Sequence, residues 1–351
     1  MASSRPGQLM AAEIAEQPEV WRGLIGHARG ASSEVAAAAK RIAAHRPRFV
    51  IFVARGSSDH AALYGKYLAE IVLKLPCGLA SPSTLTAYRA RPDLRDVLMV
   101  GISQSGSSPD LVESLEVAHG CGALTIALTN RPDSPLDQAA ALSINIQAGP
   151  ELAVAATKSY TAQLLALYLL LDRINGGAGA ETAELPDLAN VLLSRGREIA
   201  DVAQRYRFAQ RLVTTGRGYS YPTAREAALK LMETSYMSAQ AFSGADLMHG
   251  PLAVIDPQVP VLAVVNSGIG GRAMQDVLRR LAEQDADVFC VGTPAAVAAS
   301  TVGIELPAQV PEALSPLLEI LPFQQLARHL AIARGGDPDS PRGLQKVTET
   351  R

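Results

Sequence analysis

The sequence has few aromatic residues and few cysteines, and no stretch of it stays apolar for long. Only 5% of the 351 residues are aromatic, and the three cysteines, Cys77, Cys121 and Cys290, lie far apart. This spacing excludes a paired zinc motif or redox motif. No apolar run reaches bilayer length, and the first ten residues lack the apolar segment of a signal peptide. We therefore expect a soluble, cytoplasmic protein with no membrane partner, whose thiols are reduced and buried.

An excess of charge of one sign is also absent. The chain has 32 basic and 34 acidic residues, a formal net charge of -2. Such a balance gives no long-range attraction to nucleic acid or to an anionic membrane, so neither is an expected partner. The chain is 48% hydrophobic. That is ample material for the core of one large domain or of two ordinary ones.

The first half of the chain alternates short apolar runs with helical stretches. Residues 49–53 (FVIFV) read as a strand buried on both faces, and RGSSD and a predicted helix over 60–73 follow it. The run at 97–102 is followed in the same way by SQSGSS and a helix over 111–118. Further strands are predicted at 123–128 and 142–146. This alternation predicts an α/β domain with a doubly wound parallel sheet.

The same order returns in the second half. After a helix predicted over 151–174 and a linking helix near 188–206, apolar runs at 212–215 and 261–265 each lead through a glycine turn into a helix. We interpret this as a degenerate internal duplication. The predicted fold is two doubly wound parallel-sheet domains in tandem, flavodoxin-like three-layer sandwiches.

The predicted boundaries follow from this repeat. They are N-terminal helices at 1–45, a first domain at 46–180, a second domain at 181–335 and a tail at 336–351. The first of the N-terminal helices is predicted over 12–25, and Pro18 is expected to break or restart it.

Two strand-to-helix turns in the first domain are rich in glycine and serine. Glycine lets a ligand approach the backbone, a helix N-terminus favours an anion, and serine hydroxyls add donors. One such cluster is usually an ordinary loop, but two at equivalent points predict a phosphate site; the second domain has lost most of these hydroxyls. Neither turn has the spacing of a nucleotide motif, so we expect no cofactor. The candidate residues are Gly56, Ser57 and Ser58 in one turn and Ser103, Gln104, Ser105 and Ser108 in the other.

A second set of polar residues lies in the stretch 226–251. Glu226, Lys230 and Glu233 stand at i, i+4 and i+7 of a predicted helix and share one face, and His249 lies on a turn ended by Gly-Pro. Taken alone, such a helix is usually a solvated face with a weak ion pair, and such a histidine is usually structural. Together with a phosphate site, the set becomes a candidate for acid–base chemistry.

Motifs along nearly the whole chain resemble the sugar isomerase (SIS) domain family in its tandem form, like the isomerase half of glutamine–fructose-6-phosphate aminotransferase. Any one motif alone would be weak, but together they are specific. They are EIAEQP near the start, SQSG at 103–106, AGPELAVAATKSY at 148–160, EAALKLMETSY at 226–236, HGP at 249–251 and PRGLQK at 341–346.

This resemblance implies roles for individual residues. The serine turns, with Val154 and Ala156, would hold a sugar phosphate. Glu233 would move a proton between C1 and C2, supported by Glu226 and Lys230. His249 would open the sugar ring, and Lys346 in the tail would close over the sugar.

The resemblance also implies a partner chain. Family members are dimers in which the histidine turn reaches the neighbouring subunit's site, so we expect a homodimer. Whether His249 acts in its own site or in the neighbouring subunit's site stays open. No metal and no cofactor are implied.

Departures from the aminotransferase narrow the expected activity. Ala2 follows Met1 where the glutaminase domain of the aminotransferase would carry a cysteine nucleophile. Ala156 stands where the aminotransferase typically has a serine that contacts the sugar. The sequence therefore predicts the second type of glucosamine-6-phosphate deaminase, an isomerase that releases ammonia hydrolytically. Galactosamine-6-phosphate, a fructosamine-type phosphate or a plain ketose phosphate stays open as substrate. A non-catalytic sugar-phosphate sensor is disfavoured, because a sensor has no need of Glu233, His249 and Lys346 together.

Overall fold

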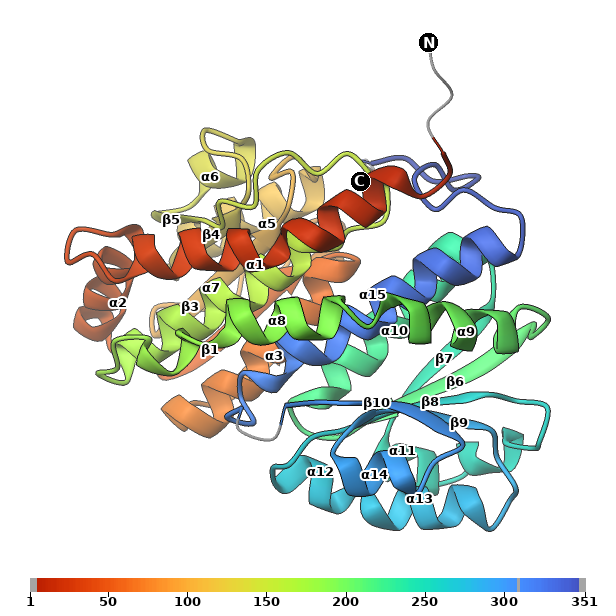
Figure 1. Cartoon of the computed structure of the whole chain (residues 1–351). Helices are drawn as coiled ribbons and strands as arrows, with labels where there is room; N and C mark the ends of the chain where they lie inside the picture. Colours follow the sequence, from red (N-terminus) through yellow and green to blue (C-terminus); the bar gives the residue numbers. More distant parts are fainter. Residues whose placement is uncertain (1–4, 308–309, 347–351) are drawn as a thin grey trace. The chain divides into compact units, whose positions relative to one another are not determined.

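The chain forms two compact units, shown in a computed structural model that describes residues 5–307 and 310–346 (Figure 1). We call one the N-terminal unit; it comprises residues 19–151 and 158–183, with Gln345 and Lys346. The C-terminal unit comprises residues 5–18, 152–157 and the described part of 184–344. The predicted tail at 336–351 can be followed to Lys346, and its last residues, 347–351, lie outside the described residues.

The N-terminal unit is built on a five-stranded parallel sheet in the order β2-β1-β3-β4-β5. Its strands are β1 (Phe49–Ala54), β2 (Cys77–Leu79), β3 (Val97–Ser103), β4 (Leu124–Thr129) and β5 (Leu142–Asn145). Strands β1 and β3 are direct neighbours, paired from Phe49 and Val97 to Ala54 and Ile102. The segments that follow these two strands therefore emerge side by side at one edge of the sheet.

Helices cover both faces of this sheet. Residues of β1 and β3 alternate, with Val53 and Met99 packing toward α4, α5 and α6, while Phe52 and Val100 pack toward α7 and η1. Helix α7 is buried on nearly all sides, which explains its almost continuous apolar run. The helices are α1 (Gln8–Ala28), α2 (Glu34–His45), α3 (Ser57–Leu68), η1 (Ala69–Leu73), α4 (Pro82–Leu85), α5 (Pro109–Gly120), α6 (Pro135–Ala139), α7 (Lys158–Ile174) and η2 (Ala180–Thr182).

The C-terminal unit repeats this plan with a parallel sheet in the order β10-β9-β8-β6-β7. Its strands are β6 (Arg211–Gly216), β7 (Ser238–Ser243), β8 (Val261–Val265), β9 (Val288–Gly292) and β10 (Val302–Glu305). Counted from its own first strand, the order is again 2-1-3-4-5, the flavodoxin-like arrangement. The predicted tandem of doubly wound α/β sandwiches, and the internal duplication, are confirmed.

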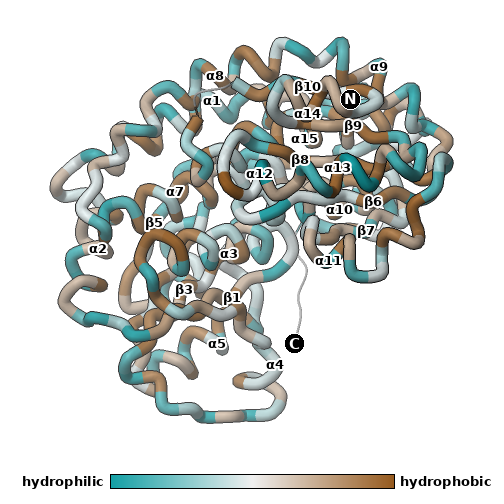
Figure 2. The backbone as a smooth tube through the Cα atoms, turned by 90° about the horizontal axis from the view of Figure 1, so that it is seen from below, coloured by the Kyte–Doolittle hydropathy of each residue, from teal (hydrophilic) through white to brown (hydrophobic). Residues whose placement is uncertain are grey.

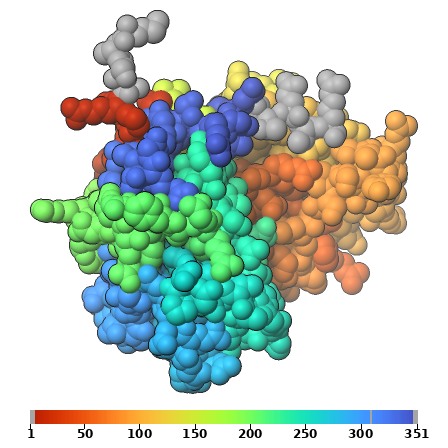
Figure 3. All heavy atoms as spheres, turned by 90° about the vertical axis from the view of Figure 1, so that its right-hand side faces the viewer, coloured from red at the N-terminus to blue at the C-terminus, as the bar shows by residue number. Residues whose placement is uncertain are grey.

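The outer layers of this unit differ in character. Helix α13 carries both polar and apolar residues along its length (Figure 2), and it buries Val277 and Leu281 against the sheet. On the other face α15 is buried on most sides and packs against α10 (Figure 1). In the space-filling view, atoms coloured blue lie directly against atoms coloured teal (Figure 3). The helices are α8 (Leu185–Leu193), α9 (Gly196–Tyr206), α10 (Ser220–Ser235), α11 (Gly244–Met248), η3 (Pro251–Val254), α12 (Ile269–Ala273), α13 (Gln275–Ala282), α14 (Pro294–Ala298) and α15 (Ser315–Ala333).

The expectation that Pro18 breaks the first helix is wrong. Helix α1 runs through Pro18 without interruption. A proline cannot donate to the carbonyl four residues earlier, which here belongs to Ile14. The side-chain amide of Gln17 donates to that carbonyl instead, at 3.0 Å. The missing backbone bond is thereby replaced within the helix.

Other predicted elements needed correction. The helix predicted over 151–174 begins only at Lys158, and the linking helix predicted over 188–206 is two helices, α8 and α9. Strands β2, β7, β9 and β10 were not predicted. The sequence of β7, SAQAFS, lacks the apolar run of a buried strand, and β7 lies at the edge of its sheet.

The cysteines are free thiols, but only Cys290 is fully buried, while Cys77 and Cys121 are half-buried. Burial raises the pKa of both Cys77 and Cys290 to about 12, which keeps these thiols protonated and unreactive. Within residues 5–307 and 310–346, no helix combines the length and apolarity needed to cross a membrane.

Candidate active site

Helix α10 brings two carboxylates and an ammonium together. The Nζ atom of Lys230 lies 3.3 Å from Oε1 of Glu226 and 2.6 Å from Oε2 of Glu233. Lys230 and Glu226 are fully buried, whereas 23% of the Glu233 side chain is exposed. The three residues therefore share one face, as their spacing predicts, and Glu233 is the member that a ligand can reach.

The buried ammonium stays charged. Burial by itself would lower the pKa of Lys230, but the attraction of Glu226 and Glu233 and their hydrogen bonds outweigh it, so the pKa lies above its usual range. One positive charge is thus held between two carboxylates. This fixes the position of Glu233 on a rigid helix, which is what a group that takes and returns a proton needs.

A second carboxylate network anchors the start of α10, and sequence reasoning missed it. Glu319 on α15 is fully buried and accepts hydrogen bonds from three hydroxyls: Ser220 at 2.7 Å, Ser315 at 2.7 Å and Thr223 at 2.9 Å. Burial raises the pKa of Glu319, and these hydrogen bonds partly oppose that rise. In the sequence, this glutamate lies inside an apolar helix with no motif around it, so nothing marked it.

His249 lies in the same unit on an exposed turn. Helix α11 is capped by Ser243, whose Oγ accepts the Asp246 N–H at 3.1 Å, and the helix ends at Met248, directly before His249. Gly250 follows with φ +119°, a conformation that a side chain would strain. In the described part of the chain, no hydrogen bond or ion pair joins His249 to Glu233. The role of His249 stays a prediction.

The two serine turns lie at the carboxyl ends of β1 and β3 in the N-terminal unit. Helix α3 begins at Ser57 rather than at the predicted residue 60, so Ser57 and Ser58 occupy its first turn behind Gly56, whose φ is +59°. The hydroxyl of Ser58 accepts a hydrogen bond at 3.0 Å from the Gln163 side-chain amide. Because that amide nitrogen only donates, the Ser58 proton is left for another acceptor. Gln163 was not predicted as a site residue.

The turn after β3 is shaped by its own serines. The Gly106 N–H donates to Ser103 Oγ at 3.1 Å, and the Ser107 N–H donates to Ser105 Oγ at 3.3 Å. Gly106 has φ +63°, and a Cβ there would lie 2.1 Å from Ser134 Oγ. The turn therefore requires glycine. Gln104 and Ser108 are partly exposed beside it.

The tail lysine is placed by a carboxylate that sequence reasoning also missed. Lys346 Nζ lies 3.1 Å from Oε2 of Glu151, whose side chain is fully buried. Glu151 also accepts the Ser159 hydroxyl at 2.6 Å and the Ser159 N–H at 3.1 Å, at the start of α7. Lys346 is 25% exposed and so remains accessible.

Val154 and Ala156 are not in α7, since they belong to the irregular segment 152–157. This segment groups with the C-terminal unit, where the Val154 N–H donates to the Asp339 carbonyl at 3.3 Å. The predicted contact of these two residues with the sugar stays a prediction.

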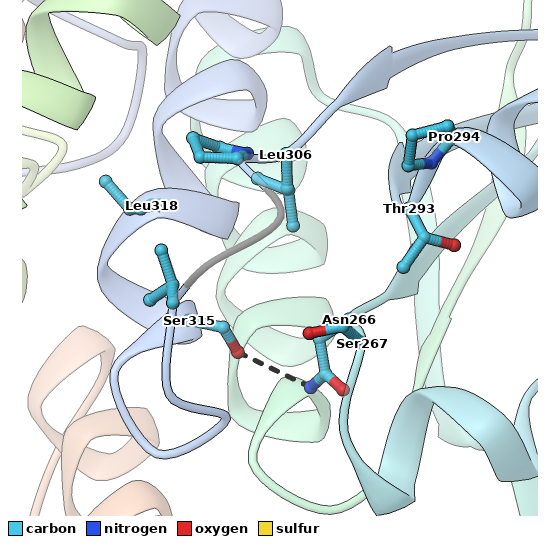
Figure 4. A pocket seen from close by; sticks show the side chains of 9 residues that line it. Asn266, Ser267, Thr293, Pro294, Leu306, Ser315 and Leu318 are labelled. Atoms are coloured by element: carbon cyan, nitrogen blue, oxygen red, sulfur yellow. Dashed lines mark hydrogen bonds between the residues drawn. The ribbon is translucent and has the colours of Figure 1, made fainter.

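The C-terminal unit has a small cavity at the equivalent edge of its sheet (Figure 4). It measures about 60 Å³. Three of its lining residues directly follow β8, β9 and β10: Asn266, Thr293 and Leu306. Ser315 of α15 also lines it and accepts a hydrogen bond from the Asn266 side-chain amide at 3.4 Å. Pockets for small organic ligands usually measure about 300–1,000 Å³, so the space enclosed by the described lining residues is much smaller than such a pocket.

The turn after β8 is occupied by the protein itself. The Glu312 carboxylate accepts the N–H groups of Ile269 and Gly270 at 2.8 and 2.7 Å. An internal carboxylate therefore lies at the start of α12, the helix that follows β8. The loss of hydroxyls from the second copy, predicted from the sequence, fits a turn that no longer receives an external anion.

Comparisons with known proteins agree with this architecture. The family model of the SIS domain matches residues 45–173 and 206–334. The isomerizing glutamine–fructose-6-phosphate aminotransferase of Gloeobacter violaceus is 35% identical over 364 residues, covering 96% of this chain and 58% of that protein. The enzyme of the same name from Thermococcus kodakarensis is 34% identical, with 96% and 57% covered. The chain thus spans little more than half the length of these relatives.

A solved structure shows the same likeness. The C-terminal domain of glucosamine-fructose-6-phosphate aminotransferase from Francisella tularensis superposes with a TM-score of 0.86 at 29% identity, covering 95% of this chain and 98% of that one. The two parallel sheets, the two matches to one family model and these relatives lead to a single conclusion. The chain belongs to the SIS domain family, with two SIS domains in tandem.

Proposed function

We propose that this chain is an aldose–ketose isomerase of amino-sugar phosphates that acts as a glucosamine-6-phosphate deaminase. The observation that carries the proposal is the Glu233 carboxylate, partly exposed and held at 2.6 Å by a buried lysine. A base that must take a proton from one carbon and return it to the next needs to be accessible and fixed, and Glu233 is both.

The proposed reaction starts from the open-chain amino sugar. Glu233 removes the proton from C2 and returns it to C1, so that the C1 aldehyde becomes a hydroxymethyl group and the C2 amine becomes an imine. Water adds to C2 and ammonia leaves, giving fructose-6-phosphate. The Lys230 ammonium, 2.6 Å from Glu233, stabilises negative charge that develops in the enolate intermediate. His249 opens the ring, in the neighbouring subunit's site if the protein is a homodimer.

Phosphate recognition is assigned to the serine turns. These residues end or follow two neighbouring parallel strands, in the part of the fold where α/β proteins bind ligands: Ser58, Ser103, Gln104, Ser105 and Ser108. Gln163 supports this assignment, because its amide leaves the Ser58 hydroxyl free to donate. Lys346 is held beside α7 by Glu151 and completes the proposed set.

The aminotransferase relatives favour a second reading, in which the chain carries out only the isomerisation of a ketose phosphate. Both readings share the transfer of a proton between C1 and C2. They differ in whether ammonia is released from the amino sugar.

Ammonia release by the purified protein tests the proposal. We expect release from glucosamine-6-phosphate, and galactosamine-6-phosphate assayed in parallel reports on the choice of epimer. Release from neither sugar, in a protein that binds sugar phosphates, would reject the deaminase. The remaining candidate functions would then be an isomerase of ketose phosphates and a non-catalytic sugar-phosphate sensor.

A further inference from the structure

An arginine directly precedes the first serine turn and is held in place by a buried carboxylate. The Nε and Nη2 atoms of Arg55 lie 2.9 and 2.7 Å from Oδ2 of Asp110. Asp110 is only 4% exposed, whereas 51% of the Arg55 side chain is exposed. Neither residue belongs to the set that the resemblance to the family implies.

This ion pair links the two serine turns. Arg55 follows β1 and lies next to Gly56, and Asp110 lies in the first turn of α5, two residues after Ser108. Strands β1 and β3 pair along their whole common length, so both turns emerge at one edge of the sheet. The guanidinium therefore lies at the junction of the two turns that are assigned to phosphate.

A bound phosphate at this junction would need a positively charged group to balance its negative charge. The serine turns offer hydroxyl and N–H donors, which are neutral, whereas a phosphate monoester carries about -1.5 to -2 charges near pH 7. Arginine has five donors in a fixed fork and can bind a carboxylate on one side and a phosphate on another. Asp110 takes Nε and Nη2, and in the described residues no partner is found for Nη1.

We propose that Arg55 is a phosphate-contacting residue of this site and that Asp110 positions its guanidinium. The inference rests on the proposed function for the identity of the ligand, a sugar phosphate. It adds a positively charged contact to two serine turns whose own donors are neutral.

The test compares Arg55→Gln and Arg55→Lys with Arg205→Gln as a matched control. Arg205 is 48% exposed and pairs with Asp287 at 2.8 Å, far from either serine turn in the sequence. The measurements are the calorimetric Kd for fructose-6-phosphate, and KM and kcat for ammonia release from glucosamine-6-phosphate. Circular dichroism checks the folding of each variant.

Loss of a hydrogen bond to a charged group predicts that Arg55→Gln raises Kd and KM about 10- to 100-fold. The value of kcat should change little, because the phosphate is bound equally in the ground state and the transition state. The Kd and KM of Arg55→Lys should lie between those of the wild type and those of Arg55→Gln. Added salt should reduce the difference in Kd between the wild type and Arg55→Gln. Arg205→Gln should match the wild type.

A Kd for Arg55→Gln within twofold of the wild type would overturn the inference. Should Arg55→Gln fail to fold, Arg55→Lys is the test. A Kd of Arg55→Lys equal to that of the wild type would also overturn the inference. Turnover by the wild type with an unaffected Arg55→Gln rejects the inference and keeps the proposed function. Binding that depends on Arg55, without ammonia release, rejects the deaminase and keeps the inference. A wild type that binds no sugar phosphate rejects both.

Discussion

Lys230 is the residue on which the arrangement of the carboxylates depends. Its ammonium is fully buried between Glu226 and Glu233, at 3.3 and 2.6 Å. Removing one partner of a buried ion pair leaves an uncompensated charge, which is costlier than losing the attraction itself. The spacing in the sequence predicts the shared face, but burial decides between a solvated ion pair and a fixed one, and burial depends on packing.

The variant Lys230→Met tests this dependence. It should lower the free energy of unfolding by about 3–5 kcal/mol, because Glu226 loses its counter-charge in a fully buried position. Denaturant unfolding measures the change. The exposed pair of Arg280 with Glu283 is the control, and Arg280→Gln should cost less than about 1 kcal/mol. Equal losses for the two variants would contradict the role given to Lys230.

Glu319 makes stability depend on pH in a defined direction. Its pKa is raised above the ordinary 4.5 by burial, so the folded protein binds a proton more tightly there than the unfolded chain does. The contribution of this group to stability is therefore fully present below about pH 4.5. It is lost as the pH rises through the folded-state pKa.

Glu319→Gln removes this titration while keeping the shape of the side chain. The stability of the wild type relative to Glu319→Gln should therefore fall as the pH rises above 4.5. Urea midpoints of both proteins over a pH series measure the difference. A difference that does not change with pH would show that Glu319 has the same pKa in the folded and unfolded states.

At the scale of elements, the strands that were predicted are short apolar runs, but β9 was missed although its sequence VFCVG is apolar and buried throughout, and the short edge strands β2 and β10 were missed as well. Strand β1 was predicted over 49–53 and spans Phe49–Ala54, and β8 was predicted with its observed bounds, Val261–Val265. Strand β7 was missed, because an edge strand can be polar. The start of α7 was misplaced by seven residues, because Glu151 caps the helix from a distance through Ser159.

Turn chemistry is the other feature that the sequence shows and the structure explains. Gly106 has φ +63° and faces Ser134 where a Cβ would lie. Gly106→Ala should therefore lower the free energy of unfolding by more than about 1 kcal/mol and weaken phosphate binding. Gly23 lies in helix α1 with open space around it, so Gly23→Ala should raise stability by about 0.5–1 kcal/mol. Thermal unfolding and calorimetry measure both effects, and similar results for the two variants would contradict the turn's dependence on glycine.

At the scale of the whole molecule, one fold occurs twice, and its two copies carry different polar groups in the turns that follow their strands. The N-terminal unit keeps serine turns in which the Ser58 hydroxyl accepts from Gln163, whereas Glu312 occupies the turn after β8 in the C-terminal unit. The duplicated pattern of strands and turns could be predicted from the sequence. The carboxylates Glu151, Glu312 and Glu319 could not, because each also binds a partner that is distant in the sequence: Lys346, Gly270 and Ser220, respectively.

The central claim is that Glu233 transfers a proton between C1 and C2 of a sugar phosphate. Proton NMR of fructose-6-phosphate in D₂O tests it directly, because each reversible transfer can replace a C1 hydrogen with deuterium. The account predicts exchange with the wild type and with the control Glu283→Gln, and a rate about 10²- to 10⁴-fold lower with Glu233→Gln. No exchange with the wild type, or an undiminished rate with Glu233→Gln, would contradict it.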